Sequence, residues 1–192
     1  MSHFFAYLSK MKFIQRWGLT YTTHSENIQE HSFQVAIVAH NLALIRNRLF
    51  EGNVNPERVA ILALYHDVSE VITGDMPAPI KYFNPEIKTA YKAIEAVASL
   101  KLLNMVPTEF KDDYQALLLE ADADHTHHRL VKAADTLCAY LKSVEEIRSG
   151  NQEYVTIEKQ LKAKVNELNL PEVQHFLEVF APSFNLILDD LN

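Results

Sequence analysis

The sequence predicts an all-α protein. Only 4 of its 192 residues are glycine, and alternating β-branched runs, which are typical of strands, are few. Apolar residues instead recur at helical spacing along most of the chain. Hydrophobic residues make up 48% and charged residues 22% of the total, as in ordinary globular proteins. A chain of this length can bury a sizeable core, so we expect a single domain over residues 1–192.

Charge and cysteine content argue against several functional classes. The net charge is −7, which disfavours nucleic-acid polymers and membranes as partners but is compatible with a small anionic substrate at a local cationic site. Cys138 is the single cysteine, so nothing indicates a disulfide or an oxidising compartment. The first residues lack the apolar core of a signal peptide, and no apolar run is long enough to cross a bilayer. We therefore expect a cytoplasmic location.

The first elements follow from apolar spacing and capping signals. Residues 3–15 have the spacing of an amphipathic helix. The next pair, Arg16-Trp17, is compatible with a half-buried surface contact or with a cation and an aromatic wall that hold an anion. Residues 19–26 are polar and irregular, which indicates a loop. Residues 27–30, Asn-Ile-Gln-Glu, form a capping box that starts the next helix.

The apolar side of this helix carries a histidine. The predicted stripe consists of His31, Val35, Val38, Leu42 and Ile45. A histidine in such a stripe is more often a hydrogen-bonded core residue than a metal ligand, unless other ligands point at it. His40 lies off the stripe, and we expect it to be structural.

The central helix is strongly apolar and leads into ionisable residues. Pro56 follows an N-cap asparagine and starts it, and residues 59–64 can only be buried. We expect the helix to reach His66 and Asp67, with Glu70 one turn after His66. Isolated polar groups are costly to bury, so this histidine and aspartate must be paired, hydrogen-bonded or metal-bound.

The second half of the chain contains a stiff loop and further helices. Residues 73–79 include two prolines and a glycine, and form either a rigid connector or a loop that walls a pocket beside Glu70, with Asp75 available for contacts. Helices are expected over residues 84–105, 108–120, 129–148 and 153–168, with short helical pieces over 171–180 and 183–191.

Two polar features of this half have different interpretations. Asp135 lies among residues that a helix over 129–148 would bury, and aspartate is rarely buried unless paired. Residues 120–128 are rich in aspartate and histidine, but we expect a solvated acidic turn with surface histidines there rather than a metal site.

One divalent ion would explain the buried ionisable residues together. It would contact the imidazoles of His31 and His66 and the carboxylates of Asp67 and Asp135. Two nitrogens and two oxygens suit first-row metals such as Mn, Co, Fe or Ni.

This arrangement resembles the HD-domain metal-dependent phosphohydrolases. Within them the chain is most similar to the bacterial 5'-deoxynucleotidases of the YfbR type, over nearly its whole length. The histidine and aspartate pattern alone indicates only the superfamily, and the Arg-Trp pair, Glu70 and the Thr-Gly-Asp-Met-Pro loop narrow the resemblance. The matching stretches are residues 16–17, 27–36, 65–77, 132–141 and 180–184.

The resemblance implies an all-α HD-domain helical bundle that hydrolyses deoxyribonucleoside 5'-monophosphates to deoxynucleoside and phosphate. It also implies a homodimer and one divalent ion, with Co²⁺ the best activator and Mn²⁺ or another first-row ion possible. The implied metal ligands are His31, His66, Asp67 and Asp135. The implied substrate contacts are Arg16, Trp17, His31, Asp67, Asp75, Met76, Pro77, Ala78 and Asp135.

Three residues are candidates for catalysis. Arg16 would neutralise and orient the phosphate. Glu70 would donate or relay a proton to the leaving 5'-alkoxide, unless it is a solvated carboxylate at a helix end. Asp75 would bond the 3'-hydroxyl or orient the nucleophile. Trp17 would pack on the sugar, and would explain a deoxy preference if it fills the space of a 2'-hydroxyl.

Two other interpretations remain. The first is another HD phosphohydrolase, either a phosphodiesterase or a dNTP triphosphohydrolase, although a triphosphate should need more cations than Arg16 with Lys81 in support. The second is a non-catalytic helical scaffold with a structural metal, although structural sites are usually closed to water.

Overall fold

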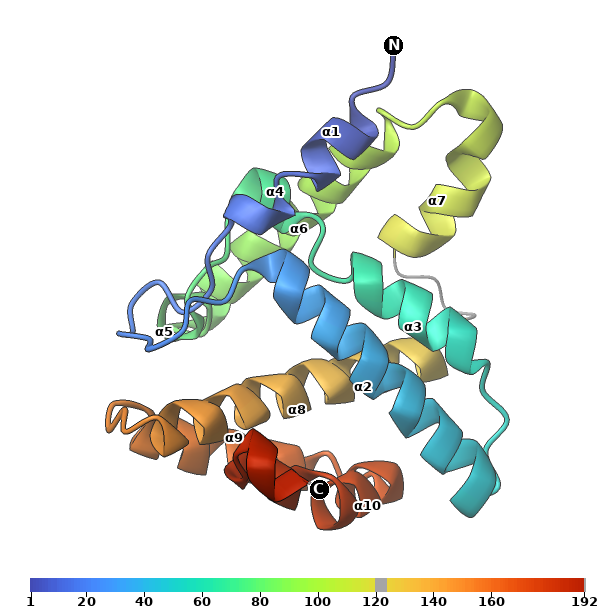
Figure 1. Ribbon diagram of the computed structural model, residues 1–192. Helices are drawn as coiled ribbons and strands as arrows, with labels where there is room; N and C mark the ends of the chain where they lie inside the picture. The colour runs from blue at the N-terminus through green and yellow to red at the C-terminus, as the bar shows by residue number, and fades with distance from the viewer. Residues whose placement is uncertain (120–123, 192) are drawn as a thin grey trace. The chain divides into compact units, whose positions relative to one another are not determined.

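The computed structural model describes residues 1–119 and 124–191, and their regular secondary structure is helical (Figure 1). The prediction of an all-α fold is confirmed. Within the described residues, no helix combines the length and apolar character needed to cross a membrane. The helices are α1 (Phe4–Leu8), η1 (Met11–Phe13), α2 (Ile28–Leu49), α3 (Pro56–Tyr65), α4 (Glu70–Thr73), α5 (Ala78–Lys81), α6 (Pro85–Leu103), η2 (Thr108–Phe110), α7 (Lys111–Leu118), α8 (His125–Arg148), α9 (Tyr154–Glu167), α10 (Pro171–Val179), η4 (Ala181–Asn185) and η5 (Leu188–Leu191).

The chain divides into two compact units, which we describe separately. Unit 1 consists of Met1–Tyr21, Ser25–Phe33 and Leu64–His125, and unit 2 of Thr22–His24, Gln34–Ala63 and Thr126–Asn192. The single domain expected over residues 1–192 stays a prediction.

Asparagine caps start three of the helices. At α2, Asn27 Oδ1 accepts hydrogen bonds from the backbone N–H groups of Gln29 and Glu30, both at 3.0 Å. Glu30 Oε2 in turn accepts from Asn27 N at 3.2 Å, which completes the capping box. Asn55 caps α3 and Asn84 caps α6 in the same way, at 2.9 and 2.8 Å. Such caps satisfy N–H groups that a helix start otherwise leaves without partners.

The core of unit 1 joins α1, the start of α2, α6 and α7. The ring of Phe4 packs edge-on against Tyr114 of α7, with centroids 4.8 Å apart. Val68, in the turn after α3, belongs to the same core, so this turn is anchored by apolar packing. The buried members of the core are Phe4, Met11, Ile28, Val68, Leu102, Leu103, Val106 and Leu118.

Two helix predictions were wrong in this unit. The helix expected over residues 3–15 is interrupted between α1 and η1. Phe5 and Phe13 are exposed, so no continuous apolar face supports a longer helix. The helix expected to reach Asp67 ends at Tyr65, and residues 66–69 form a turn. Backbone bonds between residues three apart, including Glu70 N to Asp67 O at 3.0 Å, tighten the chain there.

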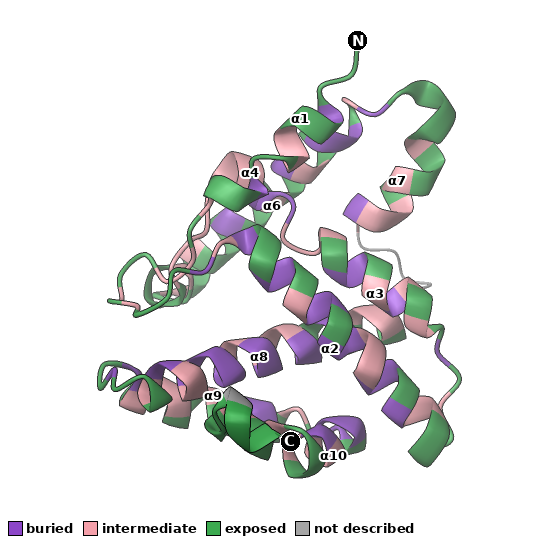
Figure 2. Ribbon diagram, viewed as in Figure 1, coloured by how far each residue is buried: buried purple, intermediate pink, exposed green. Residues whose placement is uncertain are grey.

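In unit 2, α8 buries the side that its apolar spacing predicts (Figure 2). It begins at His125, four residues earlier than expected, so the histidines predicted in a solvated turn lie in its first turn. His127 is half-buried and its Nε2 accepts a hydrogen bond from Asn55 N at 3.2 Å, which links the start of α8 to the start of α3. The other part of this prediction falls on residues 120–123, outside the described residues.

Glu146 holds the end of α8 to the loop residues Thr23 and His24. Its side chain, 1% exposed, accepts hydrogen bonds from the backbone and hydroxyl of Thr23, both at 2.8 Å. Lys142 Nζ donates to the same carboxylate at 2.6 Å and Asn151 Nδ2 at 2.8 Å. Burial alone raises the pKa of Glu146, but these donors outweigh burial and lower it to about 2.

We expect the stabilisation by Glu146 to be lost in acid. Because its pKa is about 2 in the folded state and 4.5 ordinarily, its contribution is present above pH 4.5 and lost as the pH falls towards 2. The linked free energy is about 3 kcal/mol. Denaturant unfolding of wild type and Glu146→Gln should therefore show a stability difference that shrinks between pH 5 and pH 2.5.

Glu57→Gln, which changes an exposed carboxylate on α3, is the control. A Glu146→Gln difference that stays constant across this pH range would contradict the role assigned to the carboxylate.

Candidate metal centre

The predicted site residues of unit 1 are brought together by a closed loop. Gln15 and Asn27 form an antiparallel bridge, with Arg16 N donating to Glu26 O at 2.8 Å and Ile28 N to Ile14 O at 3.0 Å. The bridge holds the two ends of the segment between Gln15 and Asn27 together. Arg16 and Trp17 therefore lie beside Glu26 and the first turn of α2.

Three of the four predicted metal ligands form one cluster. His31 comes from the first turn of α2, and His66 and Asp67 come from the turn after α3. Each offers a ligand atom within 4.8 Å of the others. Asp67 Oδ2 lies 3.1 Å from His66 Nε2 and 3.9 Å from His31 Nε2. Residues distant in sequence thus point ligand atoms at one small volume.

This cluster fits a divalent metal ion. Two imidazole nitrogens and a carboxylate oxygen are ligands that first-row divalent metals accept, and three protein ligands leave coordination positions for water or substrate. His31 is fully buried, while the side chains of His66 and Asp67 are partly exposed. Among the described residues it is the one group of histidine, cysteine and acidic side chains with this geometry.

Asp135 lies on α8 in unit 2. Its side chain is partly buried, and Oδ2 accepts a hydrogen bond from Lys132 Nζ at 3.0 Å. The aspartate is thus paired within its own helix. Asp135 as the fourth ligand stays a prediction.

Glu26 is a central residue that the sequence interpretation missed. Its Oε2 accepts hydrogen bonds from Arg16 Nε at 3.0 Å and from Trp17 Nε1 at 2.9 Å. Its Oε1 lies 3.7 Å from His31 Nδ1. Burial raises the pKa of Glu26, but His31, Arg16 and Trp17 outweigh burial and lower it to about 2. A glutamate in a polar loop gives no local signal of this role.

Arg16 and Trp17 are held tightly. The Arg16 side chain is only 13% exposed, and its Nη1 lies 3.4 Å from Asp67 Oδ2, so the guanidinium bridges Glu26 and the metal-ligand cluster. Trp17 has φ of +64°, a left-handed conformation that costs a residue other than glycine about 1–3 kcal/mol. Local strain of this kind persists only where surrounding contacts maintain it.

Glu70 is buried at the start of α4, and the possibility of a solvated carboxylate does not hold. It is 6% exposed, and its Oε2 has no hydrogen-bond partner in the described part of the chain. Burial and the nearby charges of Asp67 and Asp75 raise the pKa of Glu70 to about 9. The raised pKa favours the protonated form of the side chain, which can donate a proton.

Asp75 and its loop are fixed against α6. The carbonyl of Gly74 accepts hydrogen bonds from Tyr91 Oη at 3.1 Å and Thr73 Oγ1 at 2.9 Å. Gly74 has φ of +73°, which favours glycine at this bend. Burial raises the pKa of Asp75, with an opposing effect of Arg16. Met76 and Pro77 continue this irregular segment, and Ala78 begins α5.

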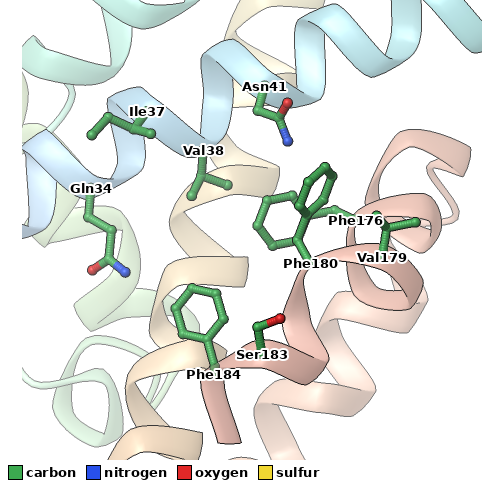
Figure 3. Close-up of a pocket in the computed structure, with 9 residues that line it drawn as sticks. All are labelled: Gln34, Ile37, Val38, Asn41, Phe176, Val179, Phe180, Ser183 and Phe184. Carbon is green, nitrogen blue, oxygen red and sulfur yellow. The ribbon is translucent and has the colours of Figure 1, made fainter. Parts of the chain in front are cut away.

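A separate cavity of about 480 Å³ lies in unit 2 and is mainly apolar. Figure 3 shows its walls, formed by α2, α10 and the residues that follow α10. None of the predicted site residues lines it, so it is distinct from the candidate metal centre.

Divalent metal should raise the melting temperature through the cluster. Binding to the folded state alone stabilises it, so Co²⁺ should raise the melting temperature of metal-stripped wild type and have a much smaller effect on His66→Ala. The matched control is His40→Ala, a histidine of α2 outside the cluster. An equal Co²⁺ effect on wild type and His66→Ala would contradict this centre.

The comparisons with known proteins agree with this geometry. Residues 3–184 match the family model described as "5'-deoxynucleotidase YfbR-like". A protein of Vibrio cholerae named 5'-deoxynucleotidase is 54% identical over 191 residues, which cover 100% of this chain and 98% of the relative. A Shewanella oneidensis protein of the same name is 52% identical over 192 residues, with 100% and 98% coverage.

Solved structures support the fold. An HD-domain phosphohydrolase from Listeria innocua superposes with a TM-score of 0.81 at 25% identity, over 95% of this chain and 88% of that protein. A cyanophage S-2L HD phosphohydrolase, bound to dA and one catalytic Zn²⁺ ion, superposes with a TM-score of 0.63 at 20% identity, over 94% and 95% of the two chains. The second likeness shows the fold alone.

Proposed function

The chain belongs to the YfbR-like 5'-deoxynucleotidase family, and we infer that it is a metal-dependent enzyme that hydrolyses deoxyribonucleoside 5'-monophosphates to deoxynucleoside and phosphate. The observation that carries this inference is the grouping of a metal-ligand cluster with a cation and a neutral acid. The guanidinium of Arg16 lies 3.4 Å from Asp67, and Glu70 is buried, with its pKa raised by burial and by the nearby charges of Asp67 and Asp75. Phosphate-ester hydrolysis needs these three functions together.

His31, His66 and Asp67 would hold the metal, with Asp135 proposed as the fourth ligand. When bound, a divalent ion polarises a phosphoryl oxygen and lowers the pKa of water. We propose Co²⁺ as the best activator on the basis of the family resemblance, and Mn²⁺ and other first-row ions suit the same ligand types.

Arg16 and Trp17 would bind the substrate. Glu26 holds the Arg16 side chain in position, and charge-assisted hydrogen bonds between a guanidinium and a phosphate are strong and directional. Trp17, on the adjacent position, would pack against the sugar. An indole fixed in place by its hydrogen bond to Glu26 would exclude a 2'-hydroxyl sterically.

Glu70 would act as the general acid. Hydrolysis breaks the bond between phosphorus and O5': the water oxygen joins phosphorus, and the leaving O5' requires a proton. A carboxyl group that is neutral at pH 7 can supply it. Asp75 would bond the 3'-hydroxyl or orient the attacking water, with Met76, Pro77 and Ala78 completing the substrate contacts.

The alternatives have less support. A triphosphate would need further cations, but Lys81 Nζ already pairs with Glu95 at 2.8 Å and lies over the Tyr91 ring. A purely structural metal site gives no reason to bury Glu70 with no hydrogen-bond partner for Oε2 among the described residues. A homodimer and a cytoplasmic location remain part of the proposal, the first from the family resemblance and the second from the cysteine content.

Substrate choice tests the function. Metal-stripped protein with Co²⁺, Mn²⁺, Mg²⁺ or Zn²⁺ added back should release phosphate from dAMP and little from AMP or 3'-dAMP. The absence of turnover on all nucleotides in a folded, metal-binding protein would contradict the enzyme assignment. Release of triphosphate from dATP would instead identify the other HD activity.

Glu70→Gln should abolish turnover without damaging the protein. Glutamine resembles the neutral carboxylic acid in shape but is not an acid, so kcat should fall about 10²–10⁴-fold. Co²⁺ affinity and melting temperature should change little. The exposed Glu86 of α6, changed to glutamine, is the control. An unchanged kcat, or a parallel loss of metal binding, would contradict the role of Glu70.

A further inference from the structure

Glu26 contacts three residues that have different proposed roles. One carboxylate oxygen accepts from Arg16, which would bind phosphate, and from Trp17, which would contact the sugar. The other oxygen faces His31, which would bind the metal. Glu26 itself is buried. One oxygen of Glu26 therefore contacts the proposed substrate-binding residues, and the other lies beside a proposed metal ligand.

Toward the metal, Glu26 places a carboxylate oxygen beside one of the two ring nitrogens of His31. A carboxylate is only an acceptor, and its Oε1 lies 3.7 Å from Nδ1, so its field favours the proton on Nδ1. The lone pair then lies on Nε2, the nitrogen that faces Asp67 at 3.9 Å. Carboxylates that contact the outer nitrogen of a metal-binding histidine orient the ring and select its tautomer in this way.

Toward the substrate, Glu26 restrains a strained residue. Trp17 adopts a left-handed backbone conformation, and its indole N–H donates to Glu26 at 2.9 Å. Arg16 Nε donates to the same oxygen at 3.0 Å. Without the Glu26 carboxylate, the half-buried N–H groups of Arg16 and Trp17 would lose the acceptor that they share. The indole would then be less restrained.

We propose that Glu26 is a positioning residue that couples metal binding to sugar selection by holding His31, Arg16 and Trp17 in one arrangement. The proposal has two parts. Its sugar arm, the effect of Glu26 on the preference for deoxyribose over ribose, rests on the proposed function. Its metal arm, the effect of Glu26 on metal affinity, concerns binding alone. Glutamine cannot replace glutamate here, because an amide has one acceptor end and one donor end. It can serve Arg16 and Trp17 or His31, but not both.

The test uses Glu26→Ala and Glu26→Gln in the full chain. In Glu26→Ala, Co²⁺ affinity measured by titration should fall about 10–100-fold. At saturating Co²⁺, the ratio of kcat/KM for dAMP to that for AMP should fall about tenfold. In Glu26→Gln, at least one of the two quantities should fall to a similar extent.

Glu172→Gln controls for the loss of a buried carboxylate, because Glu172 of α10 is fully buried and its Oε1 pairs with Arg46 Nη1 at 2.9 Å. It should leave both quantities unchanged. If either Glu26 variant fails to fold by circular dichroism, Trp17→Phe replaces it in the sugar arm, since phenylalanine lacks the N–H donor. That variant should lower the dAMP-to-AMP ratio and retain Co²⁺ affinity.

The outcomes separate the two claims. Wild type that binds Co²⁺ but releases no phosphate from dAMP would overturn the proposed function, and the Co²⁺ titration would still test the metal arm. Active wild type with a Glu26→Ala variant that retains both Co²⁺ affinity and the dAMP-to-AMP ratio would overturn the coupling. A loss of both quantities in Glu26→Ala, with neither lost in Glu172→Gln, would support it.

Discussion

The hydrogen bonds that Glu26 accepts from Arg16 and Trp17 are the interaction on which the candidate site depends. They hold an irregular, strained segment against the start of α2, and this segment adds a guanidinium and an indole to the histidine that the helix carries. The backbone bridge between Gln15 and Asn27 closes the same segment. Because of this closure, a cation and an indole lie beside His31 although they come from a loop.

Two carboxylates in unit 1 are driven to opposite charge states. The pKa of Glu26 is lowered to about 2 because His31, Arg16 and Trp17 outweigh its burial. The pKa of Glu70 is raised to about 9 by burial and by Asp67 and Asp75. Acids with divergent pKa values are typical of sites that need a fixed anion and a proton donor. Here the anion would organise the binding groups and the neutral acid would protonate the leaving group.

Local signals in the sequence predicted much of the fold. The predictions of the capping box at residues 27–30 and of the apolar stripe through His31 rest on residues close in sequence, and both are confirmed. The break after Tyr65 was missed because the turn at residues 66–69 depends on tertiary packing of Val68. Glu26 was missed for the same reason, since its partners come from the other side of a loop. The two half-buried donors of Arg16 and Trp17 were the available clue, because such donors require an acceptor.

Anomalous diffraction from crystals grown with Co²⁺ would test the metal assignment most directly. We expect a single strong peak within about 2.0–2.2 Å of His31, His66 and Asp67, with a carboxylate oxygen of Asp135 as a further ligand. The account would be contradicted by a peak elsewhere, such as at the histidines that begin α8. The absence of a peak in crystals of folded protein that contain Co²⁺ would contradict it equally.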